Sequence, residues 1–148
     1  MTGSLEAGAD LSKLVDQYGR LFYKDVTCTA ALLDGALSIV VQAGSVGKRY
    51  KVRACDLVGG GTNFGAGGNR LLDLTDGTTV YTQIANADLE TAPTASLPFG
   101  NAKVPMLTGT MDTKTVENAN LVFKYSGGTT DHTTGSIKFR VLLEEFNV

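Results

Sequence analysis

The 148-residue sequence contains no tryptophan, one histidine, two cysteines and three prolines. A catalytic zinc site usually takes three protein ligands, so one histidine without clustered cysteines supplies too few. Cys28 and Cys55 lack the CxxC spacing of zinc or redox motifs. They can form a disulfide if their strands are neighbours, or act as two small buried apolar residues. Because the sequence has no tryptophan, it does not favour a glycan-binding surface of exposed aromatic rings.

The sequence also lacks a basic cluster, a leader and a long apolar run. Thirteen Lys and Arg face fifteen Asp and Glu, and the basic residues are scattered along the chain. A nucleic-acid-binding protein should show a basic patch, so we expect no nucleic-acid partner. No basic segment followed by an apolar core opens the chain, and no apolar run approaches the ~20 residues of a membrane helix. We therefore expect a protein made in a cytoplasm, with no membrane partner and no cofactor.

Glycine and threonine are abundant, and apolar residues recur with period two from residue 21 onward. Short alternating runs between tight turns are typical of antiparallel β-proteins. The sequence predicts an all-β fold, an antiparallel jelly roll or sandwich of about eight strands with one short N-terminal helix. The predicted division is residues 1–20 as N-terminal arm and short helix, and residues 21–148 as a single β-sandwich domain.

The predicted helix carries one apolar face. Asp10 can cap it and Gly19 can end it. The apolar residues fall at i, i+3, i+4 and i+7: Leu11, Leu14, Val15 and Tyr18. A helix this short is unstable alone, so this face must pack on something. We interpret these four residues as a partner-binding surface, with the domain's own sheet as the alternative.

Two Asp-Gly pairs predict β-hairpins. Asp34-Gly35 ends the strand-like run that starts at Phe22, and residues 36–44 read as the returning strand. Asp76-Gly77 joins two further alternating runs. Asp-Gly between such runs favours a tight turn with positive φ at its central positions.

The single histidine, His132, lies in "YSGGTTDHTTGS" with Asp131 directly before it. A catalytic histidine needs a nucleophile to serve and a group to orient it, and sequence adjacency alone does not aim a carboxylate at the ring. Glycines and threonines around it are typical of a turn. We therefore predict that His132 is an ordinary residue in a hairpin loop between the last two strands.

The glycine-rich segment 59–69, "GGGTNFGAGGN", resembles a phosphate-binding loop only superficially. Such a loop opens a helix, whereas this one is followed by "RLLDLTDG", which alternates like a strand. "GSVGK" lacks the required spacing, and Arg49 stands where Ser or Thr is needed. The aspartates follow no EF-hand spacing. Segment 59–69 is predicted to be a flexible or partner-contacting loop.

From about Tyr50 to Phe146, the chain resembles small virion proteins of tailed bacteriophages. The resemblance lies in "YKVRACDLVGGGTNFGAGGNRLLDLTDGTTVYTQI" and "FKYSGGTTDHTTGSIKFRVLLEEF". Some such proteins are jelly-roll cement (decoration) proteins on the outside of HK97-type capsids. The resemblance carries no catalytic signature.

This resemblance implies a non-enzymatic virion protein, a capsid cement protein that stabilises the shell. Its partners would be the major capsid protein and itself, as homodimer or homotrimer, and its location the capsid surface. A second hypothesis is a receptor- or glycan-binding module of a phage head or tail fibre. A third is a small β-barrel enzyme with dispersed carboxylates, whose separation a sequence does not reveal.

Overall fold

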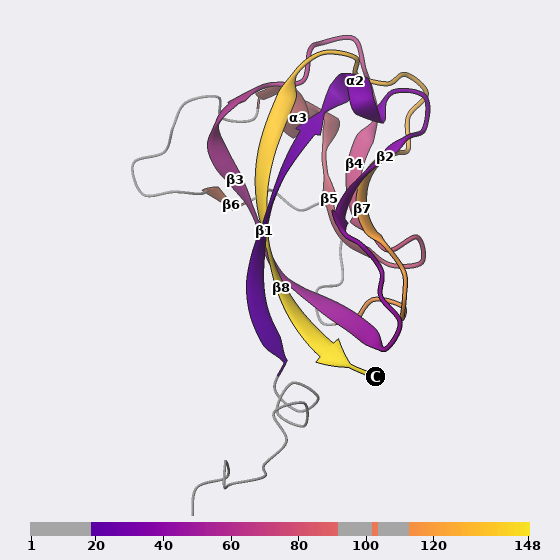
Figure 1. The fold of residues 1–148 in the computed structure, drawn as a ribbon. Coiled ribbons are helices and arrows are strands. Elements are labelled where there is room, and N and C mark those ends of the chain that lie inside the picture. Colours follow the sequence, from indigo (N-terminus) through magenta and orange to yellow (C-terminus); the bar gives the residue numbers. More distant parts are fainter. Residues whose placement is uncertain (1–18, 92–101, 104–112) are drawn as a thin grey trace, which may run out of the picture.

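The structure is a computed structural model that describes residues 19–91, 102–103 and 113–148. These residues form eight strands and two short helices, α2 and α3 (Figure 1). The strands are β1 (Arg20–Thr29), β2 (Ser38–Gln42), β3 (Lys48–Thr62), β4 (Leu71–Thr75), β5 (Val80–Ile84), β6 (Ala102–Lys103), β7 (Leu121–Ser126) and β8 (Ser136–Asn147). The helices are α2 (Ala30–Leu33) and α3 (Asn86–Thr91).

The strands form two antiparallel sheets of four, in the orders β1-β8-β3-β6 (the first sheet) and β2-β7-β4-β5 (the second sheet). Four of the pairings are nested: β4 pairs with β5, β3 with β6, β2 with β7, and β1 with β8. A chain paired in this way is one long hairpin that has been wound up, which is the jelly-roll arrangement. The prediction of an all-β antiparallel sandwich is confirmed.

The core lies between the inner faces of the two sheets. On β8 every second residue from Ile137 to Leu143 is buried, as the period-two pattern predicts. Phe139 of the first sheet stacks on Phe123 of the second, with ring centroids 4.8 Å apart. Leu72 and Leu74 of β4 fill the space beside them. Burial of these apolar side chains is the main favourable contribution to folding.

The predicted hairpin at Asp34-Gly35 is wrong. β1 pairs with β8 in the first sheet, whereas β2 pairs with β7 in the second, so the segment between them crosses from one sheet to the other. The chain first makes one turn of helix, α2, and then passes through positive φ at Gly35 and Ala36. Positive φ is correct for Gly35 but not for Asp34, which is extended, and long-range pairing decides the partner of each strand.

The predicted hairpin at Asp76-Gly77 is confirmed, with a longer loop than a two-residue turn. β4 and β5 are neighbours, and Thr75 pairs with Val80 across residues 76–79. Gly77 has φ of +91°, in the region that favours glycine. One Asp76 oxygen accepts the amides of Thr78 and Thr79, at 2.9 and 2.7 Å.

Period two along this strand predicts that Tyr50, Val52 and Ala54 share one face, but the alternation shifts by one residue at Arg53. Tyr50 and Val52 are buried, whereas the next buried residues are Cys55 and Leu57. The register between β3 and β8 slips between Val52 and Ala54, which marks a β-bulge. The bulge turns Arg53 toward Glu144 and returns the later residues to the core.

The predicted N-terminal helix falls outside the described residues, and so do its apolar positions Leu11, Leu14, Val15 and Tyr18. The first described strand begins at Arg20, next to the predicted boundary at residue 20. Neither α2 nor α3 was predicted from the sequence.

Candidate interaction surfaces

His132 is a buried residue, and its interpretation as an ordinary turn residue is wrong. Its side chain is 1% exposed and lies against the rings of Phe64 and Tyr125, with centroids 5.6 and 6.1 Å away. The loop that carries it joins β7 to β8 across the two sheets, so it is not a hairpin loop. The glycine-rich segment after β3 folds over the ring, where Gly68 leaves no room for a side chain.

The Asp131 carboxylate is bonded to Arg70 and Gly35. Its two carboxylate oxygens accept the Arg70 Nε–H at 2.7 Å and the Gly35 N–H at 2.9 Å. These bonds to Arg70 and Gly35 hold the pKa of Asp131 below its usual value. The pair His132–Asp131 therefore lacks the oriented geometry of a catalytic histidine. What the two residues do is tie three loops together at one end of the sandwich.

Segment 59–69 is predicted to be a flexible or partner-contacting loop, but its first residues belong to β3 and Asn69, with the following Arg70, is bonded to the loop before β8. The Asn69 side-chain oxygen accepts the amides of Thr129 and Thr130, and Arg70 Nη1 donates to the Gly127 and Gly128 carbonyls. β3 itself extends through the first three glycines to Thr62. This end of the molecule carries no phosphate-loop geometry, because the segment leads into a strand and not into a helix.

The two cysteines are free and buried. Cys28 pairs with Ile137 of β8 and Cys55 pairs with Val141 on the other side of that strand. One strand therefore separates them, and their positions are offset along it, which is too far for a disulfide. Burial raises the pKa of both thiols, so neither is activated as a nucleophile. Of the two readings of the sequence, the pair of small buried residues is confirmed.

Two kinds of feature are absent from the described part of the chain, a metal-binding cluster and a membrane-spanning helix. No group of three or more His, Cys, Asp and Glu side chains there is placed to hold a metal ion. No helix among the described residues is long and apolar enough to cross a membrane.

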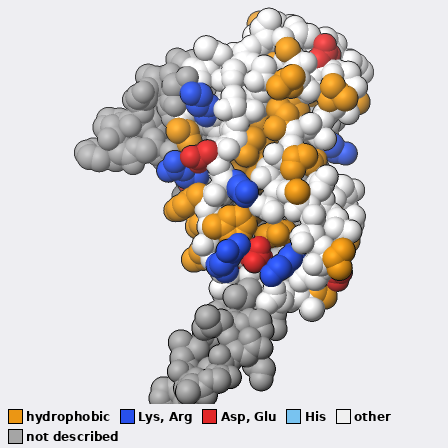
Figure 2. Space-filling view, viewed as in Figure 1, with side chains coloured by type: hydrophobic (Ala, Val, Ile, Leu, Met, Phe, Trp, Pro, Cys, Tyr) orange, Lys and Arg blue, Asp and Glu red, His pale blue; other side chains and the backbone are white. Residues whose placement is uncertain are grey.

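Exposed apolar side chains lie on β1, on α2 and the turn that follows it, and on β2. We call this set the apolar edge, and it consists of Leu21, Tyr23, Leu32, Leu37 and Val40. Leu21 and Tyr23 are 61% and 60% exposed. Figures 1 and 2 view the molecule with β1 in front, and hydrophobic side chains appear in separate groups on this face in Figure 2.

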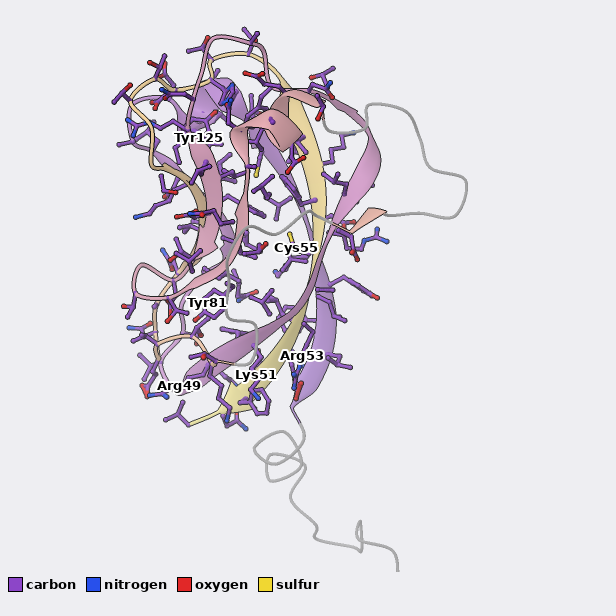
Figure 3. The ribbon with its side chains drawn as sticks, turned by 180° about the vertical axis from the view of Figure 1, so that it is seen from behind. Arg49, Lys51, Arg53, Cys55, Tyr81 and Tyr125 are labelled. Carbon is purple, nitrogen blue, oxygen red and sulfur yellow. The ribbon has the colours of Figure 1, made fainter. Side chains whose placement is uncertain are left out.

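A second feature lies on the outer face of the first sheet, at the end of β3 where the strand begins. We call it the basic row, and it consists of Arg49, Lys51, Arg53 and Lys114. Figure 3 shows the three β3 members close together at that end of the strand. The Lys51 and Lys114 ammonium groups lie 5.8 and 4.1 Å from the centroid of the Phe146 ring.

One carboxylate belongs to the same region. Glu144 accepts the Arg53 Nε–H at 2.6 Å, and its side chain is largely buried. Arg53 is therefore neutralised within the chain. Arg49, which is exposed, and the two lysines at Phe146 have no carboxylate partner among the described residues. The sequence suggested no basic patch, because these residues are scattered along the chain and only the sheet brings Lys114 beside β3.

Neither family models nor curated proteins match this chain. One solved structure is similar, described as "Cyanophage Pam1 capsid asymmetric unit". The similarity covers 86% of this chain and 86% of that chain, at 17% sequence identity and a TM-score of 0.44.

Proposed function

We propose that this chain is a structural protein of a tailed-bacteriophage virion, and that it binds the outside of an HK97-type capsid shell as a cement protein. Two things support the proposal together. The sequence of residues 50–146 resembles small virion proteins of this kind, and the jelly roll presents surfaces suited to binding another protein. The third hypothesis, an enzyme with dispersed carboxylates, has no observation in its favour.

The observation that carries the proposal is the basic row on the outer face of the first sheet. Arg49 and Lys51 precede the bulge on β3, and Lys114 reaches the same place from the segment before β7. All three are free of carboxylate partners among the described residues, so their charge is available to an acidic partner. Electrostatic complementarity of this kind accelerates encounter and fixes orientation on the partner.

The surroundings of the basic row suit a protein surface better than a polyanion. Phe146 lies beneath the two lysines, and Leu21 stands opposite Glu144 on the neighbouring strand. Apolar residues beside unpaired cations allow hydrophobic burial at the centre of a contact, with the charges around it. The predicted arm residues Leu11, Leu14, Val15 and Tyr18 would precede this region directly along the chain, and they belong to the same proposal.

Binding to capsids tests the proposal. Capsids stripped of their accessory proteins are incubated with the full chain and sedimented, and the bound fraction is measured against concentration. The wild type is expected to bind saturably, and Arg49→Glu to bind about tenfold more weakly because it reverses one interfacial charge. Lys124→Glu is the matched control, because it makes the same charge change at an exposed position of the second sheet.

Failure of the wild type to bind would refute the proposal. If the wild type and both variants bind equally well, the protein binds capsids but the basic row is not part of the contact. Raising the salt concentration should weaken wild-type binding more than binding of Arg49→Glu.

A further inference from the structure

The two sheets have four edge strands, and β1 differs from the other three. It runs for ten residues beside β8 without a break in register and contains no proline. The other edges are short among the described residues: β6 has two, and β2 and β5 have five each, with register irregularities beside both β2 and β5. Shortness and bulges are two of the features, beside charged side chains, that keep edge strands from pairing with other chains. β1 lacks both of them.

The outer edge of β1 has no strand partner in the described part of the chain. Its side chains add to this exposure, because Leu21 and Tyr23 project from the outer face and are mostly exposed. On the inner side Phe22 and Val26 pack against the core and are only half-buried. A long, regular edge strand with exposed apolar side chains offers both main-chain hydrogen bonds and side-chain contacts to a further strand.

From this geometry we infer that β1 pairs with β1 of a second copy of this chain, antiparallel and about a two-fold axis, so that the two first sheets form one eight-stranded sheet. A two-fold axis perpendicular to that sheet keeps both outer faces on one side. Residues directly opposite each other then have numbers that add to an even sum, because opposite residues share a face. Each possible register is therefore centred on one residue of β1.

Charge selects among these registers. With the axis at Phe22, Arg20 opposes Lys24, and with the axis at Lys24 or Asp25 that residue opposes its own copy. Like charges directly opposite each other are destabilising. With the axis at Tyr23, no like charges are opposed: Phe22 faces Lys24 and Leu21 faces Asp25. Axes at Leu21 or beyond Val26 also avoid like charges, but they pair fewer residues of β1. An axis at Val26 directs the chain before Tyr23 of the second copy against α2.

The register centred on Tyr23 also uses contacts that are already present. The Lys24 ammonium group lies 5.9 Å from the centroid of the Phe22 ring within one chain. In the paired sheet, the Lys24 of each copy stands opposite the Phe22 of the other, so each ring keeps a cation beside it. The Arg140 guanidinium lies 5.5 Å from the Tyr23 centroid and is held by two hydrogen bonds to Asp25, at 2.6 and 2.9 Å. Tyr23 is thus oriented before association.

Light scattering with size-exclusion chromatography of the full chain gives the first test. The wild type is expected to be a dimer at about 10 µM, a concentration that suits a strand-edge interface of modest size. Tyr23→Lys, which opposes two lysines at the axis, is expected to be a monomer. Val46→Lys is the matched control, because it places the same charge at an exposed apolar residue outside β1, and it should remain a dimer. A monomeric or trimeric wild type, or a dimeric Tyr23→Lys, would overturn the inference.

Cross-linking gives the register. Under mild oxidation Tyr23→Cys should form a disulfide-linked dimer on a non-reducing gel, because Cβ atoms of opposite residues are about 4.5–5.5 Å apart. Lys24→Cys should not cross-link, because Lys24 opposes Phe22. The wild type, with both native cysteines buried, is the background. Cross-linking of Lys24→Cys in preference to Tyr23→Cys would contradict the register. Both tests are independent of capsid binding, so their failure leaves the proposed function standing.

Discussion

The Nδ1 atom of His132 lies 2.9 Å from the carbonyl oxygen of Gly65. A carbonyl oxygen can only accept, so Nδ1 carries the proton and donates it. This bond joins the loop before β8 to the loop after β3, which are far apart in the sequence. The His132 backbone carbonyl in turn accepts the Tyr125 hydroxyl at 3.0 Å. The histidine is therefore a structural link at one end of the sandwich.

Replacing this histidine should be costly. His132→Ala removes a buried ring from between Phe64 and Tyr125 together with the bond to Gly65, so the free energy of unfolding should fall by about 2–4 kcal/mol. Urea unfolding followed by circular dichroism measures it. Thr133→Ala, at the exposed neighbouring position, should change stability by less than about 0.5 kcal/mol. If His132→Ala also lowers the free energy of unfolding by less than about 0.5 kcal/mol, His132 is an ordinary turn residue after all.

Gly135 combines a positive φ with close packing. Its φ is +100°, and a Cβ atom there would lie 2.1 Å from the Asn63 carbonyl oxygen. Gly135→Ala should therefore lower the free energy of unfolding by about 3 kcal/mol or more, since backbone must move. Gly67 has a similar φ of +109° but open space around it. Gly67→Ala should therefore lower the free energy of unfolding by only about 1 kcal/mol. Thermal melting of both variants measures the two losses of stability. Equal losses would show that Gly135 is not closely packed against the Asn63 carbonyl in solution.

Asp76 connects the β4–β5 loop to the segment before β7. Burial disfavours its charged form, but donors outweigh this effect and lower its pKa: the amides of Thr79, Val116 and Thr78, and the Tyr81 hydroxyl. Because the folded-state pKa lies below the unfolded value of about 3.9, the carboxylate contributes stability above about pH 4 and loses it as pH falls.

Asp76→Asn should therefore destabilise the protein by about 1–3 kcal/mol at pH 7, and the difference from the wild type should shrink below about pH 3. Urea unfolding across this pH range is the measurement. Asp88→Asn serves as the control, because Asp88 accepts none of these bonds. A difference at pH 7 that persists undiminished in acid would mean that the charge of Asp76 is not what matters.

Deleting residues 1–19 should leave a folded β-domain. The described core and both sheets are built from Arg20 onward, so circular dichroism of the truncated chain should keep its β spectrum and a cooperative melt. The proposed role of Leu11, Leu14, Val15 and Tyr18 in partner binding predicts a large loss of capsid affinity. Unfolding of the truncated chain would place that helix in the core, and unchanged affinity would remove it from the interface.

The fold was largely predictable from local patterns. Alternation in β8 and the Asp-Gly turn at residue 76 are local signals, and both describe the structure correctly. The pairing of β1 with β8 was not predictable, because an Asp-Gly pair opens a hairpin and a sheet crossing equally well. The bulge at Arg53 also left no sign, since it depends on the register with β8.

The candidate surfaces were less predictable than the fold. His132 looked like a turn residue because its neighbours in sequence are threonine and glycine, whereas its burial comes from residues 64–68, far away in sequence. The basic row has members on β3 that alternate as in any exposed strand face, and Lys114 joins them only through the fold. The exposure of the apolar residues at positions 21, 23, 32, 37 and 40 was not predictable either, because the sequence does not distinguish an exposed apolar residue from a buried one.

The most direct test of the proposed function is the copy number of this protein in purified virions. Quantitative mass spectrometry of virions gives its molar ratio to the major capsid protein. A cement protein should be present at a fixed ratio comparable to that of the shell protein, and should be released together with a loss of shell stability. Absence from the virion, or only the few copies expected of a tail or head fibre, would contradict the account.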